Sequence, residues 1–206
     1  MIEAAMLLGR SGGVLSPWEY IGYAELLTTS AANATAQIPA EAQAGDLLVA
    51  VMSPGNESIK TEMISGGWQR FTTGNQDYVC VTRLTDFTER PTYKKEAANA
   101  VFASVVAFRS AGWSSASLAA NNSPYSPVSI RTEGNNCLIL SIATTPGFAG
   151  SWTPGMSGGV QAPRRLRVNS PAMAIYSANI AKPSLVTNIF VNARDGSERN
   201  IILTIS

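Results

Sequence analysis

The sequence contains no histidine, and this absence removes several kinds of catalytic chemistry. Without an imidazole the chain lacks the usual general base at neutral pH, the commonest metal ligand and every Ser-His-Asp arrangement. Cysteine is scarce as well, because only Cys80 and Cys137 occur, too few for a zinc site or a disulfide scaffold. Both lie in apolar runs, which favours two reduced core thiols over the alternative of a cross-sheet disulfide. We predict no metal and no cofactor.

Charged residues are few and nearly balanced. They make up 14% of the chain, below the ~25% that is usual for soluble domains. Fifteen Lys and Arg against 14 Asp and Glu leave a net charge of +1, so there is no basic excess to neutralise a nucleic-acid backbone. No run approaches the ~18 apolar residues of a membrane-spanning helix. We therefore expect neither a nucleic-acid partner nor a membrane span.

The first residues differ in composition from the rest of the 206-residue chain. Residues 1–16 mix small and apolar side chains with three glycines, and we predict an arm that is flexible or is ordered only by a partner. The early Glu3 and the lack of a preceding Lys or Arg distinguish this start from a secretory signal. Residues 17–206 are predicted to form a single β-sandwich domain. The candidate assembly residues of the arm are the larger apolar ones: Met1, Ile2, Met6, Leu7 and Leu8.

Segments rich in β-branched and aromatic residues alternate with Gly, Pro, Asn and Ser clusters, which is typical of an all-β sandwich or barrel. The predicted strands are 18–24, 46–53, 68–72, 78–84, 101–109, 127–132, 137–144, 165–168, 172–180, 185–192 and 200–205. The continuous apolar runs 47–52 and 101–108 predict central strands that are covered on both faces. At 201–205, alternation of apolar and polar residues predicts one buried and one wet face.

Two turns carry local signals. Gly45 and Asp46 lead directly into a buried strand, and the Asp46 carboxylate is expected to accept backbone N–H bonds there. Asp195 and Gly196 supply the positive φ angles of a tight turn and predict a hairpin between the last two strands.

The second half of the sequence echoes the first. The segments 45–51, 78–82 and 101–108 have counterparts in the same order at 136–142, 172–178 and 199–206, although few residues are identical. One interpretation is that any sandwich has similar strands in series. The other is a jelly-roll-like antiparallel β-sandwich built from two similar halves.

At this point a resemblance becomes visible. Its motifs are Ala44-Gly-Asp-Leu-Leu-Val-Ala-Val51, Gly66-Gly-Trp68 and the apolar run from Ala100 to Arg109. These resemble the small β-sandwich structural proteins of tailed bacteriophages and prophages, of the tail, fibre or head-decoration type. The resemblance covers roughly residues 20–110 and is carried by core-forming motifs. It implies a virion component, present in the host cytoplasm during assembly, and it transfers no catalytic residue.

A few residues are candidates for contact with a glycan or a partner. Aromatic side chains in loop-like surroundings could stack on sugars or anchor a protein, although capping the core is their commoner fate. The one basic cluster, Arg164-Arg-Leu-Arg167 beside Pro163, could contact an acidic neighbour or an anionic glycan, but the alternation at 165 and 167 favours the wet face of an edge strand. The candidates are Trp113, Tyr125, Trp152, Arg165 and Arg167.

The sequence is compatible with three functions, of which the first is favoured. The leading one is a non-catalytic virion structural protein that assembles as a homo-oligomer with other virion proteins. The second is a carbohydrate-binding adhesion module for a host surface glycan. The third is a glycosidase that uses two carboxylates, for which Asp77, Asp86, Glu89 and Glu96 are the available acids, all expected in solvated loops.

Overall fold

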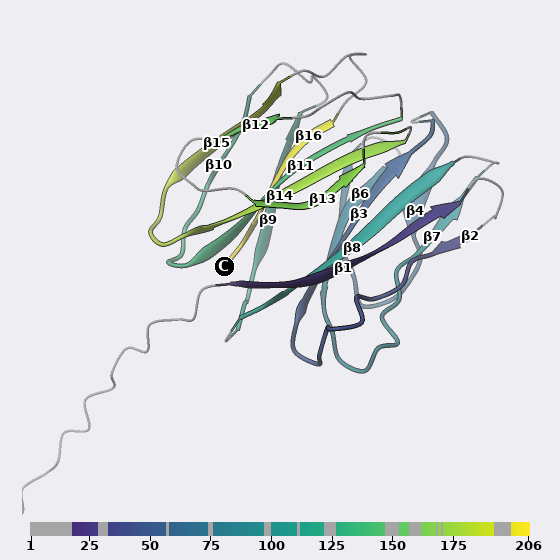
Figure 1. Cartoon of the computed structure of the whole chain (residues 1–206), viewed down its shortest axis with the longest axis horizontal. Helices are drawn as coiled ribbons and strands as arrows, with labels where there is room; N and C mark the ends of the chain where they lie inside the picture. Colours follow the sequence, from purple (N-terminus) through teal and green to yellow (C-terminus); the bar gives the residue numbers. More distant parts are fainter. Residues whose placement is uncertain are drawn as a thin grey trace, which may run out of the picture.

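The computed structural model describes residues 18–28, 33–56, 58–73, 76–96, 100–110, 112–121, 127–146, 153–156, 162–167, 169, 171–191 and 199–206. Every regular element in these ranges is a β-strand, and Figure 1 shows the strands gathered in stacked sheets. The predicted all-β sandwich is confirmed. The arm 1–16 lies outside the described residues.

The strands fall into two groups of eight. Those of the first half are β1 (Glu19–Thr28), β2 (Asn33–Thr35), β3 (Leu47–Pro54), β4 (Thr61–Met63), β5 (Gln69–Thr73), β6 (Gln76–Arg83), β7 (Thr92–Lys95) and β8 (Val101–Arg109). Those of the second half are β9 (Ala116–Asn121), β10 (Val128–Arg131), β11 (Cys137–Thr145), β12 (Thr153–Met156), β13 (Ala162–Arg167), β14 (Ala172–Ile180), β15 (Leu185–Val191) and β16 (Arg199–Ile205).

The two halves have the same topology. In the first half, strands pair in the order β1-β8-β3-β6-β5, and a second set pairs as β2-β7-β4. In the second half, the corresponding orders are β9-β16-β11-β14-β13 and β10-β15-β12. Adding eight to the number of each strand in the first half gives the number of the strand at the same place in the second half. Each half therefore has a jelly-roll-like strand order, in which β5 and β13 extend the larger set, and the two similar halves expected from the sequence echo are confirmed.

The halves differ in how their sheets are joined. In the first half a single parallel pair, Thr61 with Gln76, connects β4 to β6, so that all eight strands form one curled, nearly closed sheet. In the second half the five-stranded and three-stranded sheets are separate.

The three larger of four apolar clusters in the described part of the chain hold these layers together. The largest lies between the two halves, where β3, β6 and β8 face β11, β14 and β16. A second core fills the inside of the curled first sheet and includes Met52, Trp68 and Tyr93. A third lies between the two sheets of the second half and includes Ile139 and Ile202. Because β3 and β8 contribute to two cores, they are buried on both faces, as their apolar runs predicted.

The structure corrects two local predictions. The last two strands do not form a hairpin, because β15 pairs with β10 and β12 whereas β16 pairs with β11 and β9. The Asp195–Gly196 turn itself lies outside the described residues. Strand β16 has no wet face, because Ile201 packs into the core between the halves and Ile202 into the core of the second half.

Strand registers identify equivalent residues in the two halves. Leu47 of β3 pairs with Arg83 and Phe108, and Leu138 of β11 pairs with Asn179 and Ile205. Leu47 and Leu138 are thus equivalent, and so are Arg83 and Asn179.

Each half is also fastened to the other by a tryptophan that precedes its first strand. The carbonyl of Trp18 accepts a bond from Asn179 Nδ2 at 3.1 Å, and the carbonyl of Trp113 accepts one from Arg83 Nη2 at 2.9 Å. The two contacts are related by the internal symmetry, because Asn179 and Arg83 hold equivalent positions. Trp113 packs against the shared core and therefore serves as a core cap, the commoner of the two roles foreseen for it.

The turns before β3 and β11 give a test of this equivalence. Gly45 (φ 98°) and Asn136 (φ 58°) each lie two residues before the equivalent leucine, in the left-handed region. A side chain costs about 1–2 kcal/mol in that region, and asparagine tolerates it better than most residues. We expect Gly45→Ala to lower the free energy of unfolding by about 1 kcal/mol or more, and Asn136→Gly to leave it unchanged or raise it. Urea denaturation of both variants measures this, and a stabilising Gly45→Ala would contradict it.

Candidate functional site

Two edge strands lie next to each other at one side of the molecule. Strand β1 ends the sheet order of the first half and β13 ends that of the second (Figure 1). An ion pair between Glu25 and Arg165, at 2.5 Å, connects them across the gap between the sheets. We refer to Tyr20, Tyr23, Glu25, Phe102, Arg164, Arg165 and Arg167 as the arginine edge.

The three arginines of β13 lie against aromatic rings of the first half. The guanidinium carbon of Arg164 lies 4.4 Å from the centroid of the Tyr20 ring. That of Arg165 lies 5.4 Å from the Tyr23 ring and 5.0 Å from the Phe102 ring. That of Arg167 lies 4.8 Å from the Phe102 ring. Such contacts are stabilising when the cation is partly removed from water. The arginine edge thus closes this side of the sandwich with cation–π contacts in place of an aliphatic core.

A β-bulge explains why two successive arginines both reach the first half. Pro163 pairs with Tyr176 of β14, and Arg165 pairs with the adjacent residue Ile175. No residue of β14 is left to pair with Arg164, so Arg164 is an additional residue on β13. Bulges of this kind redirect a side chain that would otherwise point to the opposite face. Arg164 is held in place by Ser177, whose Oγ accepts from its Nε at 2.7 Å.

The first half has a different residue at the equivalent place. Val79 of β6 and Ile175 of β14 are equivalent, because they pair with the equivalent residues Val51 and Ile142. On their other side, Val79 pairs with Phe71 of β5 and Ile175 pairs with Arg165. Phe71 therefore holds the position of Arg165 in the first half. Phe71 packs against the shared core. Because this fold accepts an apolar ring at that position, Arg165 is not required by the fold itself.

The arginine edge has an excess of positive charge. Of the three guanidinium groups, only that of Arg165 is paired with a carboxylate, that of Glu25, among the residues that the structure describes. Partial burial lowers the pKa of Arg164 below its ordinary value. Burial also raises the pKa of Tyr20, partly offset by the nearby Arg164, so Tyr20 is a neutral phenol at physiological pH. An anionic group would be attracted to this edge.

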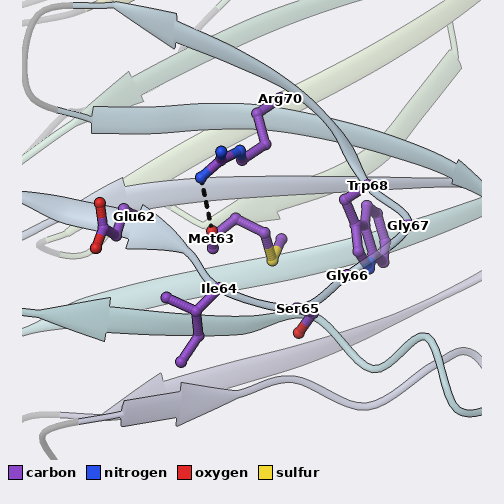
Figure 2. A pocket seen from close by; sticks show the side chains of 8 residues that line it. All are labelled: Glu62, Met63, Ile64, Ser65, Gly66, Gly67, Trp68 and Arg70. Atoms are coloured by element: carbon purple, nitrogen blue, oxygen red, sulfur yellow. Dashed lines mark hydrogen bonds between the residues drawn. The ribbon is translucent and has the colours of Figure 1, made fainter.

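A separate hollow of about 450 Å³ lies beside the loop that joins β4 to β5. Figure 2 shows Glu62, Met63 and Ile64 on one side of it, with Trp68 and Arg70 on the other. Gly67 takes a positive φ of 80°, which only glycine adopts at low cost and which lets the chain turn sharply there.

The polar groups around this hollow already have partners within the protein. Arg70 Nη1 donates to the Met63 carbonyl at 3.1 Å, the dashed line in Figure 2. The Glu62 carboxylate is 2.8 Å from Lys60 Nζ, and Trp68 Nε1 donates to the Glu89 carbonyl at 3.1 Å. Trp68 belongs to the core of the first half and caps the inside of the curled sheet. We interpret this hollow as a product of the loop structure.

The four acids considered for glycosidase chemistry do not share one environment. Asp77 is 3% exposed and accepts bonds from the Met63 N–H at 2.8 Å and the Thr72 hydroxyl at 2.5 Å. It is therefore a structural residue of the first half, which corrects the expectation of a solvated loop. Asp86 and Glu96 are exposed.

The predicted contact residues have different outcomes. Arg165 and Arg167 lie together at the arginine edge, whereas Trp113 packs elsewhere beneath Arg83. Tyr125, Trp152 and the arm residues Met1, Ile2, Met6, Leu7 and Leu8 lie outside the described residues. Strand β13 is an edge strand, as predicted, but the prediction of a wet face is wrong because the Arg165 side chain is only 13% exposed and faces β1. Sequence reasoning missed Tyr20, Tyr23 and Phe102 as parts of this site, and it identified Arg164 only as a member of the basic cluster.

Both cysteines are free and buried, in agreement with the predicted reduced thiols. Burial raises the pKa of the Cys80 and Cys137 thiols above the ordinary value. Over the described ranges no group of acids and cysteines is placed to hold a metal ion, and no helix there is long and apolar enough to cross a membrane.

Comparisons with known proteins found no matching family model, no curated protein and no solved structure with significant similarity to this chain.

Proposed function

We propose that this chain is a non-catalytic structural protein that assembles in several copies as part of a tailed-bacteriophage particle. The sequence motifs that resemble phage β-sandwich proteins support the kind of particle. The assembly itself is supported by one structural observation, the edge of β1. The proposed partners are further copies of the chain and other virion proteins.

Strand β1 offers an open edge to a second strand. It is ten residues long, and in the described part of the chain it pairs on one side only, with β8. Tyr23 and Leu27, both 48% exposed, project beside this edge. Unpaired N–H and C=O groups on a long edge strand are a template for pairing with another chain.

The neighbouring edge is protected in a way that β1 is not. Strand β13 carries Pro163, which has no N–H to donate, and a row of arginines, and both features discourage strand addition. Strand β1 has no proline, and its charged residues are Glu19 and Glu25. We therefore assign β1 as the assembly edge. The arm 1–16 of a neighbouring copy is the segment that we propose to lie along it.

A single substitution tests the assembly edge. Leu27→Lys places a charge beside the edge of β1, and we expect it to shift the protein from an oligomer to a monomer in light scattering coupled to size-exclusion chromatography. Interfaces of stable complexes bury about 1,200–2,000 Å² in total, and burial of an unpaired charge within such an interface is unfavourable. Leu185→Lys on β15, where the leucine is 58% exposed, is the matched control and should leave the oligomer unchanged.

Two outcomes would contradict the proposal. If the unmodified full-length chain is a monomer at all concentrations and does not join particles, it is not a multi-copy component. If Leu27→Lys and Leu185→Lys assemble equally well, β1 is not the assembly edge. Incorporation into particles is measured by mass spectrometry of purified virions from cells that express each variant.

A further inference from the structure

A small cavity lies at the end of the arginine edge, between the two halves. It has a volume of about 200 Å³, and its lining combines apolar side chains with the polar groups of Arg164, Ser177 and Asn179. The apolar walls come from Trp18, Phe108, Leu138 and Ala178. An apolar cavity with a few convergent polar groups is the usual form of a small-molecule site, and this one is smaller than the ~300–1,000 Å³ typical of drug-sized ligands.

The Arg164 guanidinium is held in a fixed orientation in this cavity. Its Nε donates to Ser177 Oγ at 2.7 Å, and the ring of Tyr20 lies 4.4 Å from the guanidinium carbon. Tyr20 is itself positioned by a bond from its hydroxyl to the Arg164 carbonyl, at 3.4 Å. The two terminal nitrogens of Arg164 form no ion pair with any carboxylate of the described residues, in contrast to Arg165, which is paired with Glu25.

The Arg164 side chain is half-buried, and its partners in the described part of the chain are one ring and one hydroxyl. Partial burial lowers the pKa of Arg164. An arginine fork binds a carboxylate through two parallel N–H···O bonds, which is a much stronger interaction than the contacts already present.

The internal symmetry indicates that this arrangement is specific to one side. Ser177 pairs with Leu140, and the equivalent residue of the first half is Val81, which pairs with Val49. The first half has no residue equivalent to Arg164, because Arg70 and Phe71 pair with successive residues of β6 without a bulge between them. The same fold is thus built with an apolar residue at the position of Ser177 and without an inserted arginine.

From these observations we infer that the cavity is a binding site for the carboxylate of a small molecule, with the terminal nitrogens of Arg164 as its ligands. Ser177 and Tyr20 are positioning residues that orient the guanidinium. The apolar lining accepts the body of a ligand about the size of one sugar ring or one amino acid. This inference is independent of the proposed assembly.

The test is a titration of the full-length protein, followed by ¹H–¹⁵N NMR at low salt. Glucuronate and N-acetylaspartate represent the two sources of a carboxylate, an acidic sugar and an acidic amino acid. Glucuronamide, which has the same ring but no charge, is the matched ligand control. We expect shifts at residues around the cavity with at least one of the two acids, and the tighter binder identifies the source.

Variants assign the site. Arg164→Gln should weaken binding about 10- to 100-fold, the range for a lost hydrogen-bonded charge pair. Arg164→Lys keeps the charge but not the fork and should give an intermediate loss. Ser177→Val, the residue of the other half, should weaken binding less than Arg164→Gln. Arg131→Gln removes an exposed arginine of β10 that lies outside the cavity lining and outside the arginine edge, and this variant should bind as the unmodified protein does.

Three results would overturn the inference. These are the absence of binding by either acid at tens of millimolar, equal binding of glucuronamide and glucuronate, and unchanged affinity in Arg164→Gln. If Arg164→Gln does not fold, as judged by its NMR spectrum, then Arg164→Lys and Ser177→Val decide in its place, and unchanged affinity in both counts against the site.

Discussion

Replacement of Phe102 by alanine is expected to lower the free energy of unfolding by about 3–5 kcal/mol, the range for truncation of a fully buried phenylalanine. Phe102 is 1% exposed and lies in the core that both halves share. Its ring also lies under two guanidinium groups, 5.0 Å from that of Arg165 and 4.8 Å from that of Arg167. Truncation therefore leaves a cavity in the shared core and removes the support of the arginine edge.

Phe87→Ala is the matched control for this measurement. Phe87 is 48% exposed, so the same change should alter stability by no more than about 0.5 kcal/mol. Urea denaturation followed by tryptophan fluorescence measures both variants. Equal losses for Phe87→Ala and Phe102→Ala would mean that the core between the halves does not hold the molecule together.

The second large effect is expected at Asp77. Asp77→Ala removes the acceptor of the buried Met63 N–H and of the Thr72 hydroxyl, and it removes the carboxylate that lies 3.8 Å from Arg70 Nη1. A buried N–H left without a partner costs about 1–3 kcal/mol, and the lost bonds to a charged group add to this. We expect a total loss of about 2–4 kcal/mol in the free energy of unfolding.

Asp77→Asn separates the contributions. Asparagine keeps an oxygen that can accept from Met63 but has no charge, so we expect a smaller loss than with alanine. Thermal unfolding by circular dichroism gives the order of the three proteins. If Asp77→Ala is as stable as the unmodified protein, the Asp77 bonds do not hold the β4–β5 loop in place.

Much of the fold could be predicted from the sequence because its long strands have strong patterns. The apolar runs of β3, β8, β11 and β14 gave their positions to within about one residue. The strands that escaped prediction, β2, β4, β7, β9 and β12, contain three to six residues each. A strand of three residues is too short to display a period of two, and such strands are defined by their partners.

The candidate site was harder to predict, for a different reason. The spacing of Arg165 and Arg167 shows that both side chains lie on the same face of a strand. It does not show whether that face is exposed to solvent or covered by another sheet. That depends on β1, about 140 residues earlier in the chain, which lies against β13. The role of Arg164 depends on a bulge, and the adjacent Pro163 is compatible with either a bulge or an edge strand, so it does not distinguish the two. Only the neighbouring sheet gives these arginines their surroundings.

The repeated topology has a consequence for symmetry. Because the topology occurs twice in one chain, equivalent surface positions also occur twice. The equivalence is broken in charge, because Arg165 in one half stands where the other half has Phe71. The two halves therefore present different charges at the same place of the same fold.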